Sequence, residues 1–127
     1  MLNRAQIIGN LGDDPKVRTI SNDGAKAASF NVATTERGYT LPNGTQVPER
    51  TEWHNIVCFG KHADVVDKYL KKGAKVYIEG KMRTRSYDDK NGIKRYVTEI
   101  YAENMVMLDS RQQQQPQEQN QQEDVPF

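Results

Sequence analysis

The stretch TEWHNIVCFGKHADVVDKYLKKGAKVYIEGKMRTRSY (residues 51–87) decides the fold, because its apolar pattern changes period twice. The first and last parts alternate every second residue, as β-strands with one buried face do. In residues 61–73, by contrast, Ala63, Val66 and Leu70 lie three and four positions apart. That spacing places them on one face of a helix. The stretch therefore predicts a strand, a helix and a second strand.

The flanks of this stretch carry further β signals. Gly73 stands where a left-handed cap is expected at the end of the helix. Turn residues divide residues 3–108 into short apolar runs, and Ala28, Phe30 and Val32 share one face at period two. The predicted strands are residues 4–11, 25–36, 51–60, 74–87 and 93–108, with a shorter run at 16–20.

Five main strands with one helix between the third and the fourth match the OB-fold, a five-stranded Greek-key barrel. We therefore predict an all-β chain with an OB-fold domain at residues 1–108 and a disordered glutamine-rich tail at 109–127. A plain β-sandwich is the alternative, and the inserted helix favours the barrel. The intervening loop, 37–50, has a predicted hairpin tip at Asn43.

Residues 75–87 predict a nucleic-acid surface. Their alternation separates a packing face, with Val76, Ile78, Gly80, Met82 and Thr84, from an opposite face that is basic and aromatic. The members of this second face are Lys75, Tyr77, Glu79, Lys81, Arg83, Arg85 and Tyr87. Cations interleaved with aromatic rings are typical of single-stranded nucleic-acid binding.

Trp53 and Phe59 share a parity on the preceding strand and lie ~20 Å apart at about 3.3 Å per residue. Exposed, they would offer flat platforms on which bases stack, with roughly 1 to 3 kcal/mol per base and no sequence preference. The opposite assignment has both rings in the core, with His54, Ile56 and Cys58 outside. The pattern alone leaves these two assignments equally open.

No catalytic constellation emerges from the 127 residues. His54 and His62 are the only histidines, and the single cysteine, Cys58, has no evident base beside it. We expect no enzyme, no cofactor and no metal. The lone cysteine also predicts a cytoplasmic protein, and no run of about 18 apolar residues predicts a membrane span. The formal net charge is only +1, but residues 1–110 hold 17 Lys and Arg against 14 Asp and Glu, while residues 111–127 hold one Arg against three acids. This asymmetry is weak evidence for a polyanion partner.

Four motifs give the chain a family resemblance. In order they are IIGNLGDDPKVR, TEWHNIVCFGK, KKGAKVYIEGKMRTRSY and the final EDVPF. They resemble the motifs of bacterial single-stranded DNA-binding proteins, over the barrel and the tail together. The resemblance implies a non-enzymatic, nucleoid-associated homotetramer that wraps single-stranded DNA during replication, recombination and repair.

The resemblance also assigns roles to residues. It implies that Trp53 and Phe59 are exposed and stack on bases, with Tyr87 and, as a substitute in a variable loop, Tyr39. It places His54 at the subunit interface. The basic residues that it assigns to the phosphate backbone are Arg4, Lys61, Lys72, Arg83 and Arg85.

The end of the tail is expected to recruit partners. Glu123 and Asp124 supply negative charge, Val125 and Phe127 supply apolar contacts, and Pro126 limits the entropy lost on binding. Such a tip would dock in a basic-rimmed apolar pocket on replication, recombination and repair proteins. Two rival functions remain, an RNA chaperone with similar aromatics and an assembly factor that binds nucleic acid only incidentally.

Overall fold

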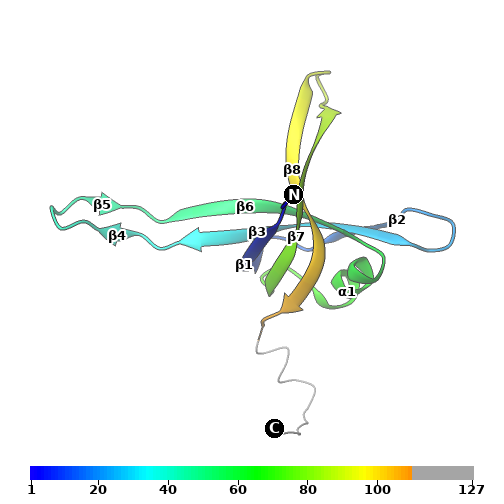
Figure 1. The fold of residues 1–127 in the computed structure, drawn as a ribbon, viewed down its shortest axis with the longest axis horizontal. Coiled ribbons are helices and arrows are strands. Elements are labelled where there is room, and N and C mark those ends of the chain that lie inside the picture. The colour runs from blue at the N-terminus through cyan, green and yellow to red at the C-terminus, as the bar shows by residue number, and fades with distance from the viewer. Residues whose placement is uncertain (110–127) are drawn as a thin grey trace, which may run out of the picture.

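The computed structural model describes residues 1–109, and Figure 1 shows a small β-barrel from which long two-stranded arms extend. The elements in chain order are β1 (Ala5–Leu11), β2 (Lys16–Thr19), β3 (Lys26–Glu36), β4 (Tyr39–Thr40), β5 (Gln46–Val47), β6 (Arg50–Phe59), α1 (Lys61–Tyr69), β7 (Lys75–Asp88) and β8 (Lys94–Met107).

The barrel closes because β1 pairs twice. The sheet order is β1-β7-β8-β6-β3-β2, and β1 also pairs with β3, where Asn10 and Leu11 face Ala33 and Val32. Closure requires a close approach at Gly9, since a Cβ there would lie 2.2 Å from the carbonyl oxygen of Ala33. The five strands β1, β7, β8, β6 and β3 thus form one barrel, with α1 between β6 and β7. This confirms the predicted OB-fold.

The core follows from the period-two alternation. On β3 the buried side chains include Ala28, Phe30 and Val32, as predicted, together with Ala27, and on β6 they are Ile56 and Cys58. The helix covers one end of the barrel with the residues that its periodicity indicated. The remaining core members include Leu11, Ala63, Val66, Leu70, Ala74, Val76, Ile78 and Ile100.

The helix ends earlier than the sequence suggests. Its C-cap is Leu70, whose backbone is extended (φ −91°, ψ 142°) and whose N–H still donates to the carbonyl oxygen of Val66. The prediction that Gly73 caps the helix is therefore wrong. Gly73 does adopt a positive φ of 89°, but it does so in the turn where Ala74 donates to Lys71, which returns the chain to β7.

Two arms differ from the predicted packing. Met82 and Thr84 were expected to pack, yet both are exposed, because β7 and β8 leave the barrel and continue as a free hairpin (Figure 1). The predicted loop 37–50 contains a second, two-stranded sheet of β4 and β5. The hairpin tip at Asn43 is confirmed, since its side chain accepts from the backbone of Thr45.

The side chain of Cys58 is buried in the core. It is 1% exposed, and burial raises the pKa of its thiol to about 11. The thiol is therefore protonated at neutral pH, where a protonated thiol is a poor nucleophile. The helical part of residues 1–109 contains no segment long and apolar enough to cross a membrane.

Candidate nucleic-acid interface

The outward row of β6 carries the two aromatic residues that the sequence left undecided. Trp53 is 55% exposed and Phe59 is 44% exposed, whereas Ile56 and Cys58 between them are buried. Large apolar side chains half exposed to water are costly unless a ligand covers them. The alternation is thus resolved with the aromatic rings outside.

A groove crosses the barrel beside Phe59. We call its larger part the main hollow, which has a volume of about 660 Å³ and is open to solvent. It is walled by β2 and β3 on one side and by β6, β7 and β8 on the other. The residues that line it are Lys16, Val17, Arg18, Ala27, Ala28, Ser29, Val57, Phe59, Arg85, Glu99 and Tyr101.

An aromatic pair forms part of the wall of the main hollow. The rings of Phe59 and Tyr101 have centroids 5.8 Å apart and are tilted by 39°. They meet because β6 and β8 run parallel there, with Val57 opposite Tyr101. The guanidinium carbon of Arg83 lies 4.8 Å from the centroid of the Tyr101 ring. A cation over a ring at this distance is a favourable contact, so Arg83 is held beside the hollow.

Arg85 and Glu99 form an ion pair in the groove. The Nε atom of Arg85 donates to Oε1 of Glu99 at 3.0 Å, and an Nη atom donates to Oε2 at 3.3 Å. Glu99 is 7% exposed and is the one buried charged or polar residue in the described chain. Its hydrogen bond and its charge raise the pKa of the Arg85 guanidinium. The pair fixes the guanidinium within the groove while leaving other N–H groups free to donate.

A smaller side hollow, of about 250 Å³, continues the groove. It shares Ser29, Arg85 and Glu99 with the main hollow and adds Asn55 and Tyr87. The guanidinium carbon of Arg85 is also 5.9 Å from the Tyr87 ring centroid. Arg85 therefore stands between two hollows, each with aromatic residues in its wall.

Other predicted site residues lie elsewhere. Tyr39 is 59% exposed on β4, at the far end of the arm that β3 and β6 form (Figure 1). Lys61 begins α1 and Lys72 lies in the turn after it. Arg4 is ion-paired with Glu79.

His54 points away from the outward row of β6. Its Nε2 is 2.9 Å from Oγ1 of Thr34, within the same chain.

Among the charged and aromatic residues that line the main hollow, four were not predicted as site residues, namely Lys16, Arg18, Glu99 and Tyr101. Glu99 and Tyr101 share a parity on β8, which was a signal available in the sequence. What the sequence did not reveal is the parallel pairing of β8 with β6, which brings that parity beside Phe59.

The groove offers cations and aromatic rings. Within residues 1–109 there is no cluster of three or more His, Cys, Asp or Glu side chains that could hold a metal ion. Cations together with aromatic rings suit a single-stranded nucleic acid, whose unstacked bases can contact the rings while its phosphates contact the cations.

Comparisons with known proteins agree with this geometry. The model of the Single-strand binding protein family matches residues 2–108. The chain is 57% identical over 107 residues to a single-stranded DNA-binding protein of Bacteroides thetaiotaomicron, which covers 84% of this chain and 66% of that protein. It is 46% identical over 111 residues to single-stranded DNA-binding protein 1 of Xylella fastidiosa, which covers 87% of this chain and 80% of that one. The chain thus spans just under two thirds of the length of the Bacteroides relative.

A solved structure also resembles the fold. It is described as a Plasmodium falciparum SSB complex with ssDNA, and it superposes with a TM-score of 0.75 at 34% identity. The superposition covers 86% of this chain and 97% of that one.

Replacing Arg85 with alanine should lower the urea midpoint of unfolding, because the buried carboxylate of Glu99 loses its charged partner. Adding Glu99→Gln should restore most of the loss, since an amide needs no counter-charge. Arg83→Ala is the matched control, because its contact with Tyr101 is exposed. An unchanged midpoint in Arg85→Ala would contradict this account of the pair.

Proposed function

The chain belongs to the single-strand binding protein family, whose members are non-enzymatic DNA-binding proteins, and from this premise we propose how it acts. It binds single-stranded DNA without sequence preference along the groove and protects it during replication, recombination and repair. The family also confirms the expectation that the chain is not an enzyme.

The observation that carries the proposal is the exposure of two large aromatic rings, Trp53 and Phe59, each about half exposed. Arg85 lines the main hollow together with Phe59 and Tyr101, and Arg83 lies over the Tyr101 ring. Every base has a π-face, so stacking on these rings tolerates any sequence. The cations beside them suit the phosphates that follow each base.

The same arrangement predicts discrimination against duplex DNA. Bases in a duplex are already stacked on one another, and their faces are not available to Phe59 or Trp53. A single strand can turn its bases toward the rings while its phosphates contact the cations of the groove, such as Lys16 and Arg18. Binding therefore replaces water over the rings and releases counterions from the strand.

The more distant site residues extend this path in the proposal. Tyr39 would stack a base that reaches the β4–β5 arm, and Tyr87 would stack one at the side hollow. Lys61 and Lys72 would hold phosphates near the ends of α1. Arg4 would need to exchange its ion pair with Glu79 for a phosphate, so we expect the smallest contribution from it.

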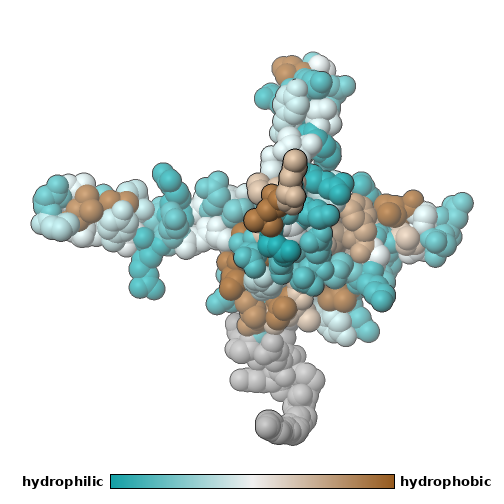
Figure 2. All heavy atoms as spheres, viewed as in Figure 1, coloured by the Kyte–Doolittle hydropathy of each residue, from teal (hydrophilic) through white to brown (hydrophobic). Residues whose placement is uncertain are grey.

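We propose a homotetramer whose contact surface includes the outer face of β1, β7 and β8. There Ile8, Tyr77 and Val106 are paired across the three strands, and Ile8 and Val106 are each about half exposed at 53% and 51%. Figure 2 shows hydrophobic residues gathered around this part of the barrel. An apolar row rimmed by polar groups is typical of subunit contacts. His54 would contribute to a second contact between subunits.

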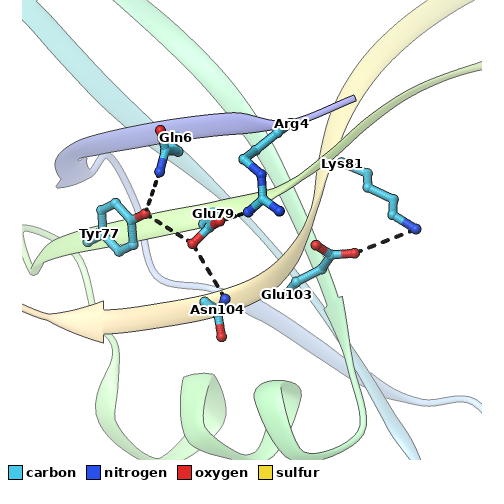
Figure 3. Close-up of polar contacts among 7 residues, drawn as sticks. All are labelled: Arg4, Gln6, Tyr77, Glu79, Lys81, Glu103 and Asn104. Atoms are coloured by element: carbon cyan, nitrogen blue, oxygen red, sulfur yellow. Dashed lines mark hydrogen bonds and ion pairs between the residues drawn. The ribbon is translucent and has the colours of Figure 1, made fainter. Parts of the chain in front are cut away.

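A polar cluster next to this row supports the same proposal (Figure 3). Gln6 donates to the hydroxyl of Tyr77 at 3.0 Å, and that hydroxyl donates to Glu79 at 3.1 Å. Arg4 and Asn104 also contact the Glu79 carboxylate. Such a cluster fixes the side chains before association, which reduces the entropy lost at an interface.

We also propose recruitment of replication, recombination and repair proteins through residues 123–127, which lie outside the described residues. The proposal keeps residues 1–108 as the DNA-binding domain. Its support is the sequence, where two acids precede an apolar pair and a proline. A protein with this function would act in the cytoplasm, at the nucleoid.

Replacing Trp53 or Phe59 with alanine should weaken binding of oligo(dT) by roughly 5- to 150-fold each, because each loses one stacked base. Fluorescence quenching or anisotropy measures the affinity of the Phe59 variant, and anisotropy that of the Trp53 variant. Tyr69→Ala is the matched control, since Tyr69 is an exposed aromatic on α1, 48% exposed, and outside the groove. The assembly-factor rival predicts no loss in either variant.

Salt and competitor titrations test the same proposal further. Affinity should fall with salt, with a slope of about 0.7 per phosphate contact, and salt-independent binding would contradict the groove. Preference for poly(U) over matched poly(dT) would favour the RNA chaperone instead.

Replacing Ile8 with glutamate should reduce the mass of the protein in light scattering, because four buried carboxylates would be left without partners at the proposed contact. Glu103→Gln, outside the apolar row, is the control and should leave the mass unchanged. A wild-type protein of monomer mass would contradict the tetramer.

Deleting residues 123–127 should abolish capture of replication and repair proteins while leaving oligo(dT) affinity within about twofold, because the tip makes no groove contact with DNA in the proposal. Pull-down with the purified variant measures capture. Loss of both activities would mean that the tip serves the fold.

A further inference from the structure

Gly12 lies directly under the indole of Trp53. A Cβ atom built on Gly12 would fall 2.3 Å from Cζ3 and 2.7 Å from Cη2 of that ring. Both distances are far inside van der Waals contact, so any side chain at position 12 would displace the ring. The six-membered ring of Trp53 therefore packs against the backbone at Gly12, in space that the Cβ of any other residue would occupy.

The backbone itself does not demand glycine at this position. Five other glycines have positive φ angles between 61° and 89°, where a side chain is strained, and Gly12 is not among them. Alanine could adopt the main-chain conformation of Gly12 without strain. The space taken by the Trp53 ring is what excludes a larger residue.

The floor under the ring is fixed by hydrogen bonds from neighbouring segments. The N–H of Gly12 donates to the carbonyl oxygen of Asn31 at 3.1 Å. One residue earlier, Leu11 donates to Ala74 and accepts from Gly73, both at 2.9 Å. The strip thus cannot move away from the ring without breaking bonds to β3 and to the start of β7.

The side chain of Trp53 is only partly buried. It is 55% exposed, and within the described chain no ring stacking or cation contact involves its indole. Contact with Gly12 therefore covers one part of the ring, while more than half of the residue's surface stays open to solvent. A base can stack there only if the ring keeps a defined orientation.

We infer that Gly12 is a positioning residue that seats the Trp53 ring in the orientation in which it stacks on DNA, an inference that rests on the proposed function. A ring that lacks this seat samples several rotamers and must be ordered anew when a base binds. The side chain of Trp53 stays available in that case, but its affinity for the base falls.

The test is a double-mutant cycle between positions 12 and 53. Phenylalanine lacks the two ring carbons, Cζ3 and Cη2, that a Cβ at Gly12 would meet. Gly12→Ala should therefore weaken oligo(dT) binding on the order of tenfold in the Trp53 protein, and less than twofold in a Trp53→Phe background. Equal losses in the two backgrounds would overturn the inference, because they would show that Gly12 acts through the main chain.

Fluorescence adds a readout in the absence of DNA, because Trp53 is the only tryptophan of the chain. Gly12→Ala should shift its emission to longer wavelength and increase its quenching by acrylamide, as the ring leaves its seat. An unchanged spectrum would contradict the inference about Gly12 and leave the proposed function untouched. Failure of the wild-type protein to bind oligo(dT) overturns the proposed function, and the two failures are thus distinguishable.

The wild-type protein provides a measurement that needs no variant to fold. Nuclear Overhauser contacts should join the Gly12 Hα protons to the Hζ3 and Hη2 protons of Trp53, and the ring current should shift the Gly12 Hα resonances. Trp53→Phe should abolish that shift, with the Gly9 Hα resonances as an internal reference. Absence of the contact in the free protein would contradict the inference.

Discussion

The double pairing of β1 is the constraint on which the rest of the structure depends. Residues 5–10 pair with β7, and Asn10 and Leu11 then pair with β3. This crossing brings backbone so close to backbone that Gly9 has no room for a side chain. It joins the first and the last of the five main strands at Asn10 and Leu11, which closes the sheet there. It also fixes what is inside and what is outside.

Closure turns a simple alternation into a binding surface. Once the barrel is closed, its interior holds Phe30 together with Val32, Ile56 and Ile78. On β6, Trp53 and Phe59 have the opposite parity to the buried Ile56 and are left half exposed. A half-exposed aromatic ring forgoes part of the hydrophobic stabilisation that burial would give. The chain thus retains its rings on the surface at some cost in stability, which stacked bases would offset in the proposed function.

Periodicity revealed most of the fold, because the strands and the helix each have a local signal. The main strands, the helix and the buried members of β3 were all predictable in this way. The errors came where tertiary context decides. Gly73 was assigned to the end of the helix, but the chain leaves the helix at Leu70 in an extended conformation. Met82 keeps the alternation of β7, but the barrel has ended before it.

The candidate site was predictable residue by residue but not as a surface. Trp53, Phe59, Arg83 and Arg85 follow from the alternation and the family motifs. Their neighbours Tyr101 and Glu99 lie more than forty positions after Val57 and Asn55, and they join the groove only through the parallel pairing of β6 and β8. No local sequence pattern indicates that β6 and β8 pair in parallel, because α1 and β7 lie between them in the chain.

Net charge contributes little to the proposed binding of a polyanion, since the chain carries a formal charge of only +1. Several cations of the barrel are also paired with acids. The pairs are Arg4 with Glu79, Lys26 with Asp64 and Asp67, Lys81 with Glu103, Arg85 with Glu99 and Arg95 with Asp89. Coulomb attraction is therefore local and modest.

Stacking does not depend on net charge, and at roughly 1 to 3 kcal/mol per base a few platforms supply as much free energy as many phosphate contacts. Stacking contacts the face that all bases share and not the edges by which bases differ, so binding that depends mainly on stacking has no sequence preference. It also favours single strands, whose bases are free to turn, over duplexes with the same phosphate charge. In the proposed function, the orientation of a few rings therefore contributes more to DNA binding than the number of lysines and arginines does.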